Sequence, residues 1–115
     1  MTNLFSNEED ESNGLVKAWA QINADGTIAA CWRCNTDPAE TGQTSLGDYE
    51  VDFTPLATDI SGRPRSATID NLGTGSAASG TIELADRSGD PSSVFVSTED
   101  AAGAEADRPF VLIIY

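Results

Sequence analysis

Residues 16–34, VKAWAQINADGTIAACWRC, decide the fold class because they have the pattern of a single β-hairpin. Every second residue from Val16 to Ile22 is apolar, which is the period of a strand with one buried face. Asn23-Ala24-Asp25-Gly26 then supplies turn residues, and Gly26 is suited to a positive φ. A second strand over Thr27–Cys34 completes the predicted hairpin.

Outward from this hairpin, five further runs have strand character and are bounded by glycine, proline or other turn residues. No segment sustains the i, i+3, i+4 apolar spacing of a helix, and ten glycines and five prolines interrupt the chain. The sequence therefore predicts an all-β fold of about seven antiparallel strands in a small sandwich or barrel. The five further strands are expected at Tyr49–Phe53, Ala67–Ile69, Thr81–Ala85, Ser93–Ser97 and Pro109–Tyr115, with the third and fourth forming a second hairpin.

Three of these segments carry more detailed expectations. Residues 35–47 are polar and are predicted to form a loop. In the strand that follows, Glu50 and Asp52 alternate with apolar residues, which places both acids on a solvent-facing side. Residues 109–115 are continuously apolar, so this strand is expected to be buried on both faces or to lie at a subunit contact.

The chain of 115 residues matches one domain, which we place at residues 15–115. Residues 1–14 contain four consecutive acids among Ser, Asn and Gly, a composition that predicts a flexible acidic arm. Within the arm, Leu4 and Phe5 are candidates for an anchor on a neighbouring subunit, the alternative being a frayed terminus. The arm lacks the basic and apolar regions of a signal peptide, so we expect a soluble protein made in the cytoplasm, with no membrane partner.

The net charge of −13 comes from 19 acidic against six basic residues. Nucleic-acid binding requires a basic stripe, which a single lysine and five scattered arginines do not supply, so we expect no nucleic-acid partner. The acidity indicates either a solubility device or adaptation to a saline medium.

The sequence contains no histidine, which removes the commonest general base and the commonest zinc ligand. A Ser-Lys dyad would have to use Lys17, which has no motif serine beside it. We therefore expect no enzyme, no catalytic residues and no cofactor or metal. Oxygen-rich loops still leave calcium open as an alternative, either at Asn35, Asp37 and Glu40 or at Asp86 and Asp90, although neither has EF-hand spacing.

Cys31-Trp32-Arg33-Cys34 is a CxxC motif with three interpretations. The two thiolates fill half of a zinc site, whose other ligands would be carboxylates or a second subunit. A redox pair normally lies at a helix N-terminus, whereas this pair ends a strand. The third interpretation is a pair of structural thiols or a disulfide, which requires a bulge or turn because residues i and i+3 of a regular strand point to opposite faces.

Trp19 and Trp32 fall on the same register of the two hairpin strands, so they are expected to face each other. They form either a cross-strand aromatic pair or an exposed patch for a protein or a sugar ring.

Three stretches support a family resemblance. Residues 18–28 contain A-x-x-N-x-D-G-T, residues 47–53 contain G-x-Y-x-V-x-F, and residues 106–110 read A-D-R-P-F before the last strand. Over residues 15–115 the chain resembles a β-module found in phage tail fibres and virion appendages and in bacterial surface proteins. The resemblance implies a β fold with an assembly or surface-binding character, and it implies no catalytic residues.

We therefore expect a non-enzymatic virion structural protein, either a capsid decoration (cement) protein or a small tail-fibre module, that assembles through strand edges, the C-terminal strand and the arm. Its partners are expected to be other copies of itself, with a trimer favoured, and a capsid or tail protein. The alternative is a carbohydrate-binding or surface-binding module of a bacterial protein. The predicted assembly or binding surface consists of Leu4, Phe5, Trp19, Trp32, Phe110, Ile114 and Tyr115.

Overall fold

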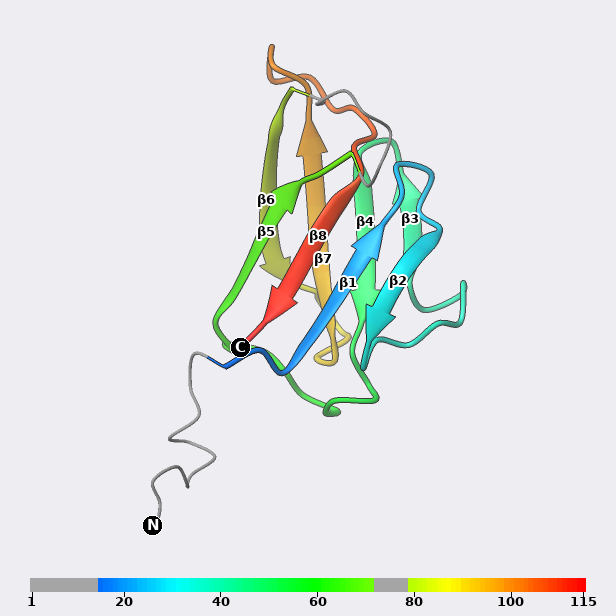
Figure 1. The fold of residues 1–115 in the computed structure, drawn as a ribbon, viewed down its shortest axis with the longest axis vertical. Helices are drawn as coiled ribbons and strands as arrows, with labels where there is room; N and C mark the ends of the chain where they lie inside the picture. The colour runs from blue at the N-terminus through cyan, green and yellow to red at the C-terminus, as the bar shows by residue number, and fades with distance from the viewer. Residues whose placement is uncertain (1–14, 72–78) are drawn as a thin grey trace.

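The computed structural model describes residues 15–71 and 79–115, which form two four-stranded antiparallel sheets packed face to face (Figure 1). Sheet A contains, in spatial order, β2 (Ile28–Trp32), β1 (Ala18–Ile22), β8 (Phe110–Ile114) and β5 (Arg65–Ile69). Sheet B contains, in spatial order, β3 (Gly42–Ser45), β4 (Asp48–Asp52), β7 (Ser93–Glu99) and β6 (Thr81–Asp86).

The prediction of an all-β fold is confirmed, with eight strands in place of seven. The additional strand, β3, lies inside the segment that was expected to be a loop. Its sequence, GQTS, has no apolar alternation, so no pattern marks it as a strand. It forms because it pairs with β4, with Gly42 opposite Glu50 and Gln43 opposite Tyr49.

The first hairpin is formed by β1 and β2 as predicted, with Gln21 opposite Ala30. In its turn, Thr27 donates both its backbone N–H and its hydroxyl to Oδ1 of Asp25, at 3.0 and 2.6 Å. Gly26 has a φ of +91°, and a Cβ added there would lie 2.5 Å from the backbone nitrogen of Gln43. Glycine is therefore required both for the turn and for its close contact with β3.

The second predicted hairpin is also present, with β6 antiparallel to β7. A salt bridge of 2.7 Å between Arg65 of β5 and Asp86 of β6 joins the edges of the two sheets on this side of the sandwich.

The core lies between the sheets and is formed by alternate residues of the central strands. The rings of Tyr49 and Phe110 meet edge to face, with centroids 5.1 Å apart. Each fully buried large apolar side chain of this kind contributes about 1.5–3 kcal/mol to stability. The fully buried core side chains are Ala18, Ala20, Ile22, Tyr49, Val51, Phe53, Val94, Val96, Phe110, Leu112 and Ile114.

Of the two alternatives for the last strand, burial on both faces is wrong, because the residues of one face are only partly buried, and a subunit contact stays a prediction. β8 lies in the centre of sheet A and is paired with β1 and β5, so it offers no free edge for assembly. Its residues alternate between fully and partly buried, and Phe110 and Ile114 are 0% exposed. The prediction that these two side chains form a surface is therefore wrong, because they point into the sandwich. Leu4 and Phe5 lie outside the described residues.

Candidate functional site

The outer face of sheet A is an almost uncharged surface on an acidic protein. None of the four strands of sheet A contains Asp or Glu. The strands of sheet B contain six acids, namely Asp48, Glu50, Asp52, Glu83, Asp86 and Glu99. The register of sheet A places the following residues on its outer face: Trp19, Gln21, Ala30, Trp32, Ser66, Thr68, Val111 and Ile113.

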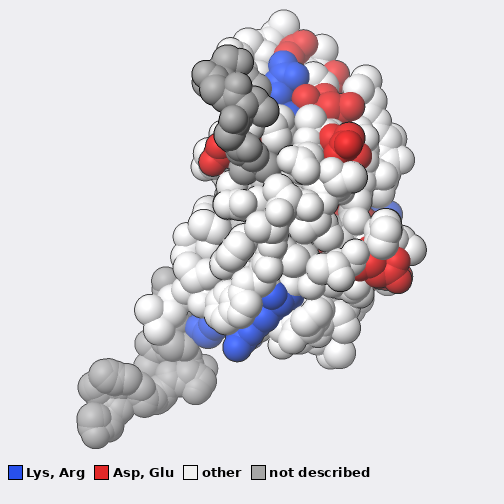
Figure 2. All heavy atoms as spheres, turned by 45° about the vertical axis from the view of Figure 1, so that its right-hand side comes forward, with Lys and Arg blue, Asp and Glu red and all other residues white. Residues whose placement is uncertain are grey.

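Figure 2 shows this separation of charge from the β2 side of the molecule. Acidic atoms lie mainly towards the top and the right-hand side, with a smaller group at the left edge; basic atoms lie at the lower edge and in one group at the top, and the broad middle area is uncharged. A partner that contacts this middle area meets few carboxylates.

Trp19 and Trp32 lie directly opposite each other on β1 and β2, as the sequence predicts. Trp32 is 43% exposed, while Trp19 is half-buried and lies opposite Ile113 of β8 on its other side. The face therefore carries a continuous apolar row that runs from Trp32 across Trp19 to Ile113.

Cys31 and Cys34 are joined by a disulfide, and their Cα atoms are 5.9 Å apart. The turn that the bond requires is made at Arg33, which has a φ of 65° and is the only non-glycine residue with a positive φ in the described part of the chain. This conformation costs a non-glycine residue about 1–2 kcal/mol. The Arg33 guanidinium carbon lies 4.5 Å from the ring centroid of Trp32, so the disulfide loop presents a stacked Trp-Arg pair at the edge of the face.

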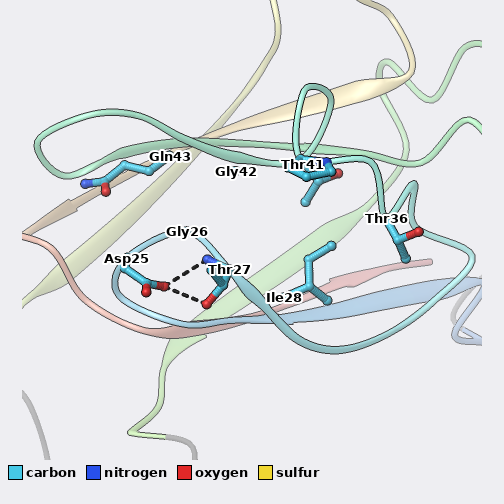
Figure 3. Close-up of a pocket in the computed structure, with 9 residues that line it drawn as sticks. Asp25, Gly26, Thr27, Ile28, Thr36, Thr41, Gly42 and Gln43 are labelled. Carbon is cyan, nitrogen blue, oxygen red and sulfur yellow. Dashed lines mark hydrogen bonds between the residues drawn. The ribbon is translucent and has the colours of Figure 1, made fainter.

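A pocket of about 640 Å³ lies between the turn of the first hairpin and the start of β3 (Figure 3). In Figure 3, Ile28 and Thr41 point towards each other across the gap, while Asp25 and Gln43 lie towards one end and Thr36 towards the other. The complete lining is Asp25, Gly26, Thr27, Ile28, Thr36, Pro38, Thr41, Gly42 and Gln43, so the pocket offers hydroxyl, amide and carboxylate groups and no basic side chain.

The pocket is held in shape by hydrogen bonds at its turn. The hydroxyl of Tyr49 donates to the carbonyl of Ala24 at 2.7 Å and accepts the backbone N–H of Arg108 at 3.2 Å. The hydrogen bond from the Thr27 hydroxyl, followed by that from its backbone N–H, lowers the pKa of Asp25 below its ordinary value. Asp25 is therefore ionised at neutral pH, and the pocket favours neutral or cationic ligands over anions.

Asp52 has a structural role that the sequence pattern did not indicate. The prediction that it lies on a solvent-facing side is wrong, because the residue is 2% exposed. Its Oδ2 accepts from Asn35 Nδ2 at 3.0 Å and from the Thr54 hydroxyl at 2.6 Å. Its Oδ1 accepts from the Thr54 backbone N–H and from the hydroxyls of Ser92 and Ser93, at 3.2, 2.6 and 3.2 Å.

These bonds also determine the protonation state of Asp52. Burial alone raises the pKa of the Asp52 carboxyl, but the hydrogen bonds from Ser92, Thr54, Asn35 and Ser93 outweigh it, so the pKa lies below its ordinary value of 3.8. A buried carboxylate with its acceptor positions filled joins three loops and is not available to a ligand. The only sequence signal for this role is the density of Ser, Thr and Asn at the ends of the neighbouring segments.

The two loops considered for calcium are engaged in local bonds. Asp37 accepts the backbone N–H of Ala39, and the Asp90 carboxylate accepts the hydroxyls of Ser92 and Ser93. Among the described residues, no three Cys, Asp or Glu side chains are grouped so as to hold a metal ion.

Of the residues proposed for the surface, Trp19 and Trp32 lie opposite each other, and Tyr115 lies beside the same face. Tyr115 comes directly after β8, and its hydroxyl is 3.2 Å from that of Ser66 on the outer face. It therefore adjoins the face that carries Trp19 and Trp32.

Within residues 15–71 and 79–115, no helix is long and apolar enough to cross a membrane. Comparison with known proteins adds no relative to this geometry, since no family model, curated protein or solved structure matches the chain.

Proposed function

We propose that this chain is a non-enzymatic structural module of a virion, either a capsid decoration (cement) protein or a small tail-fibre module, that docks through the outer face of sheet A. The observation that carries the proposal is that, in the part of the chain that the structure describes, every acid carried by a strand belongs to sheet B. A protein with a net charge of −13 approaches other proteins against electrostatic repulsion, and an acid-free face reduces that repulsion where contact is made.

The chemistry of the face supports the same function. Tryptophan and arginine are enriched at the energetic centres of protein interfaces, and Trp32 and Arg33 are stacked at the edge of this face. The resemblance of residues 15–115 to modules of phage virion appendages supplies the proposed setting. The proposed partners are a capsid or tail protein and further copies of the chain.

The location is tested by mass spectrometry of gradient-purified particles from the strain that carries the gene. We expect the chain to co-purify with the particles in many copies. Its absence from particles that contain the other virion proteins would contradict the proposal.

The docking face is tested by adding purified variants to particles that lack the chain. Trp32→Ser should reduce binding to the particles, because it removes the most exposed tryptophan of the face. Leu46→Ser is the matched control, because Leu46 is also exposed, at 58%, but lies between β3 and β4. An equal loss of particle binding in both variants, or no loss in either, would exclude the outer face as the docking surface.

The pocket favours a second candidate function, a carbohydrate-binding module. Its hydroxyl and amide groups surround the apolar side chains of Ile28 and Pro38, a combination that suits a neutral, hydroxyl-rich ligand. Titration with a panel of neutral oligosaccharides, followed by NMR, should then shift the signals of the pocket residues. Thr36→Val should weaken binding and Thr58→Val, an exposed position outside the pocket, should not. Absence of saturable binding across the panel would reject this function.

A further inference from the structure

The further inference concerns the partner of Arg33. In a chain with 19 acids and six bases, carboxylate partners are plentiful for the five arginines. Among the described residues, Arg65 and Arg87 have one, at 2.7 Å from Asp86 and 2.9 Å from Glu50. Arg63 and Arg108 instead donate to the backbone oxygens of Tyr115 and Ser79, at 3.1 and 2.8 Å. Arg33 contacts no carboxylate of the described residues, and its only hydrogen bond there is a long one of 3.4 Å from Nη1 to the carbonyl of Lys17.

The backbone around Arg33 is built to present this side chain. The disulfide between Cys31 and Cys34 closes a four-residue loop in which Arg33 holds a left-handed conformation. The side chain is exposed and stacks on Trp32, which fixes the plane of the guanidinium while most of its five N–H donors stay unused. A guanidinium held in this way suits a carboxylate, which it binds through two parallel hydrogen bonds.

The surroundings of Arg33 select an acidic partner that also carries apolar side chains. The strands of sheet A contribute no carboxylate that would repel it. The row from Trp32 to Ile113 offers an apolar surface next to the guanidinium. The fitting ligand is therefore a peptide segment in which large apolar residues lie a few positions away from a run of acids.

The chain itself contains such a segment. Leu4 and Phe5 are followed after two residues by Glu8-Glu9-Asp10-Glu11. Fourteen residues precede Leu15, and at about 3.3 Å per extended residue they span up to roughly 46 Å. A five-residue strand is only about 17 Å long, so the segment of one copy is long enough to cross the outer face of another.

We propose that Arg33 and Trp32 bind the acidic N-terminal segment, residues 4–11, of a second copy of this chain. The outer face alone is too small for a stable interface, which supports an additional contact by the N-terminal segment. Four strands of about five residues cover roughly 300 Å² in projection, whereas each partner of a stable interface buries about 800 Å². Two copies that exchange segments form two identical contacts, which adds the missing area. This inference rests on the proposed use of the outer face for assembly, but its test does not involve virion particles.

The test is a charge swap in the full-length chain, followed by sedimentation velocity. Arg33→Glu should weaken self-association at least about ten-fold, and so should replacement of Glu8, Glu9, Asp10 and Glu11 by lysine. A mixture of the two variants should associate again, because each contact then joins opposite charges. Self-association of the unaltered chain should also weaken between about 0.05 M and about 0.5 M NaCl.

Arg108→Glu is the matched control, because Arg108 makes the same charge change just before the start of β8 and also contacts no carboxylate of the described residues. It should leave self-association unchanged, and circular dichroism should show that all variants are folded.

A chain that is monomeric at all concentrations would overturn the inference. So would variants that fail to recover on mixing, since failure to recover is the result for a contact within one chain. If the chain also co-purifies with particles in these cases, the proposed function stands and only the second-copy contact is rejected.

Discussion

Replacing Asp52 with asparagine keeps the shape of the side chain but turns one of its two acceptor oxygens into an NH₂ group. In the less disruptive orientation the NH₂ replaces Oδ2, where it opposes the donating Nδ2 of Asn35 and forces the Thr54 hydroxyl to reverse its hydrogen bond. A hydrogen bond to a charged group contributes about 1.5–3 kcal/mol. The loss of the Asn35 bond and the weakening of the others, partly offset by relief from burying a charge, lower the free energy of unfolding by about 3 kcal/mol.

This loss is a large fraction of the roughly 5–15 kcal/mol that stabilises a domain. With a urea m-value of about 1.5 kcal/mol per molar, Asp52→Asn should lower the unfolding midpoint by about 2 M, measured by tryptophan fluorescence at neutral pH. Asp59→Asn is the matched control, since it removes the same charge from an exposed carboxylate whose hydrogen bonds within the described residues go only to Ser61. Its midpoint should change much less.

The pH dependence provides a second check. Because the folded-state pKa of Asp52 lies below its ordinary value of 3.8, its stabilising effect is fully present above pH 3.8 and is lost as the pH falls through the folded-state pKa. The difference between the unaltered chain and Asp52→Asn should therefore shrink in acid. Equal midpoints at neutral pH, or a difference that does not change with pH, would refute the assignment of a buried, hydrogen-bonded carboxylate.

Three further outcomes are expected from urea unfolding. Gly26→Ala should destabilise the fold by about 1–2 kcal/mol more than Gly62→Ala, because both positions have a positive φ but only at Gly26 does the added Cβ meet Gln43; equal effects would show that the turn does not pack on β3. Leu112→Ala should cost about 2–5 kcal/mol and Val111→Ala clearly less, because Leu112 points into the core and Val111 lies on the outer face; a reversed order would contradict the register of β8. Raising NaCl from about 0.05 M to about 1 M should raise the unfolding midpoint, because salt screens the repulsion of a chain with a net charge of −13; an unchanged midpoint would count against both self-repulsion and a saline adaptation.

The sequence predicted the local elements wherever one residue pattern was sufficient. Alternation with a period of two and the turn residues around Gly26 identified the first hairpin and its register, including the pairing of Trp19 with Trp32. The short strand Gly42–Ser45 was missed because it is polar throughout and depends on hydrogen bonds to β4. Propensity carries no information about a strand that a neighbour imposes.

The candidate site was predicted only in part, for a similar reason. Trp19, Trp32 and Tyr115 lie on or beside one face, but Phe110 and Ile114 are buried. A continuous apolar run does not reveal which of its residues point inward, because that depends on the sheet that covers one side.

The sequence by itself therefore determined the all-β class, the main hairpins, the acidic charge and the absence of histidine, since these depend on composition or on neighbouring residues. Only the tertiary structure decided which strands share a sheet. That pairing separates the acid-free strands from the acidic ones and surrounds Asp52 with donors from distant loops. It also places the first hairpin, whose pattern decides the fold class, at one edge of the uncharged face. These contacts join residues far apart in the chain, and no local pattern records them.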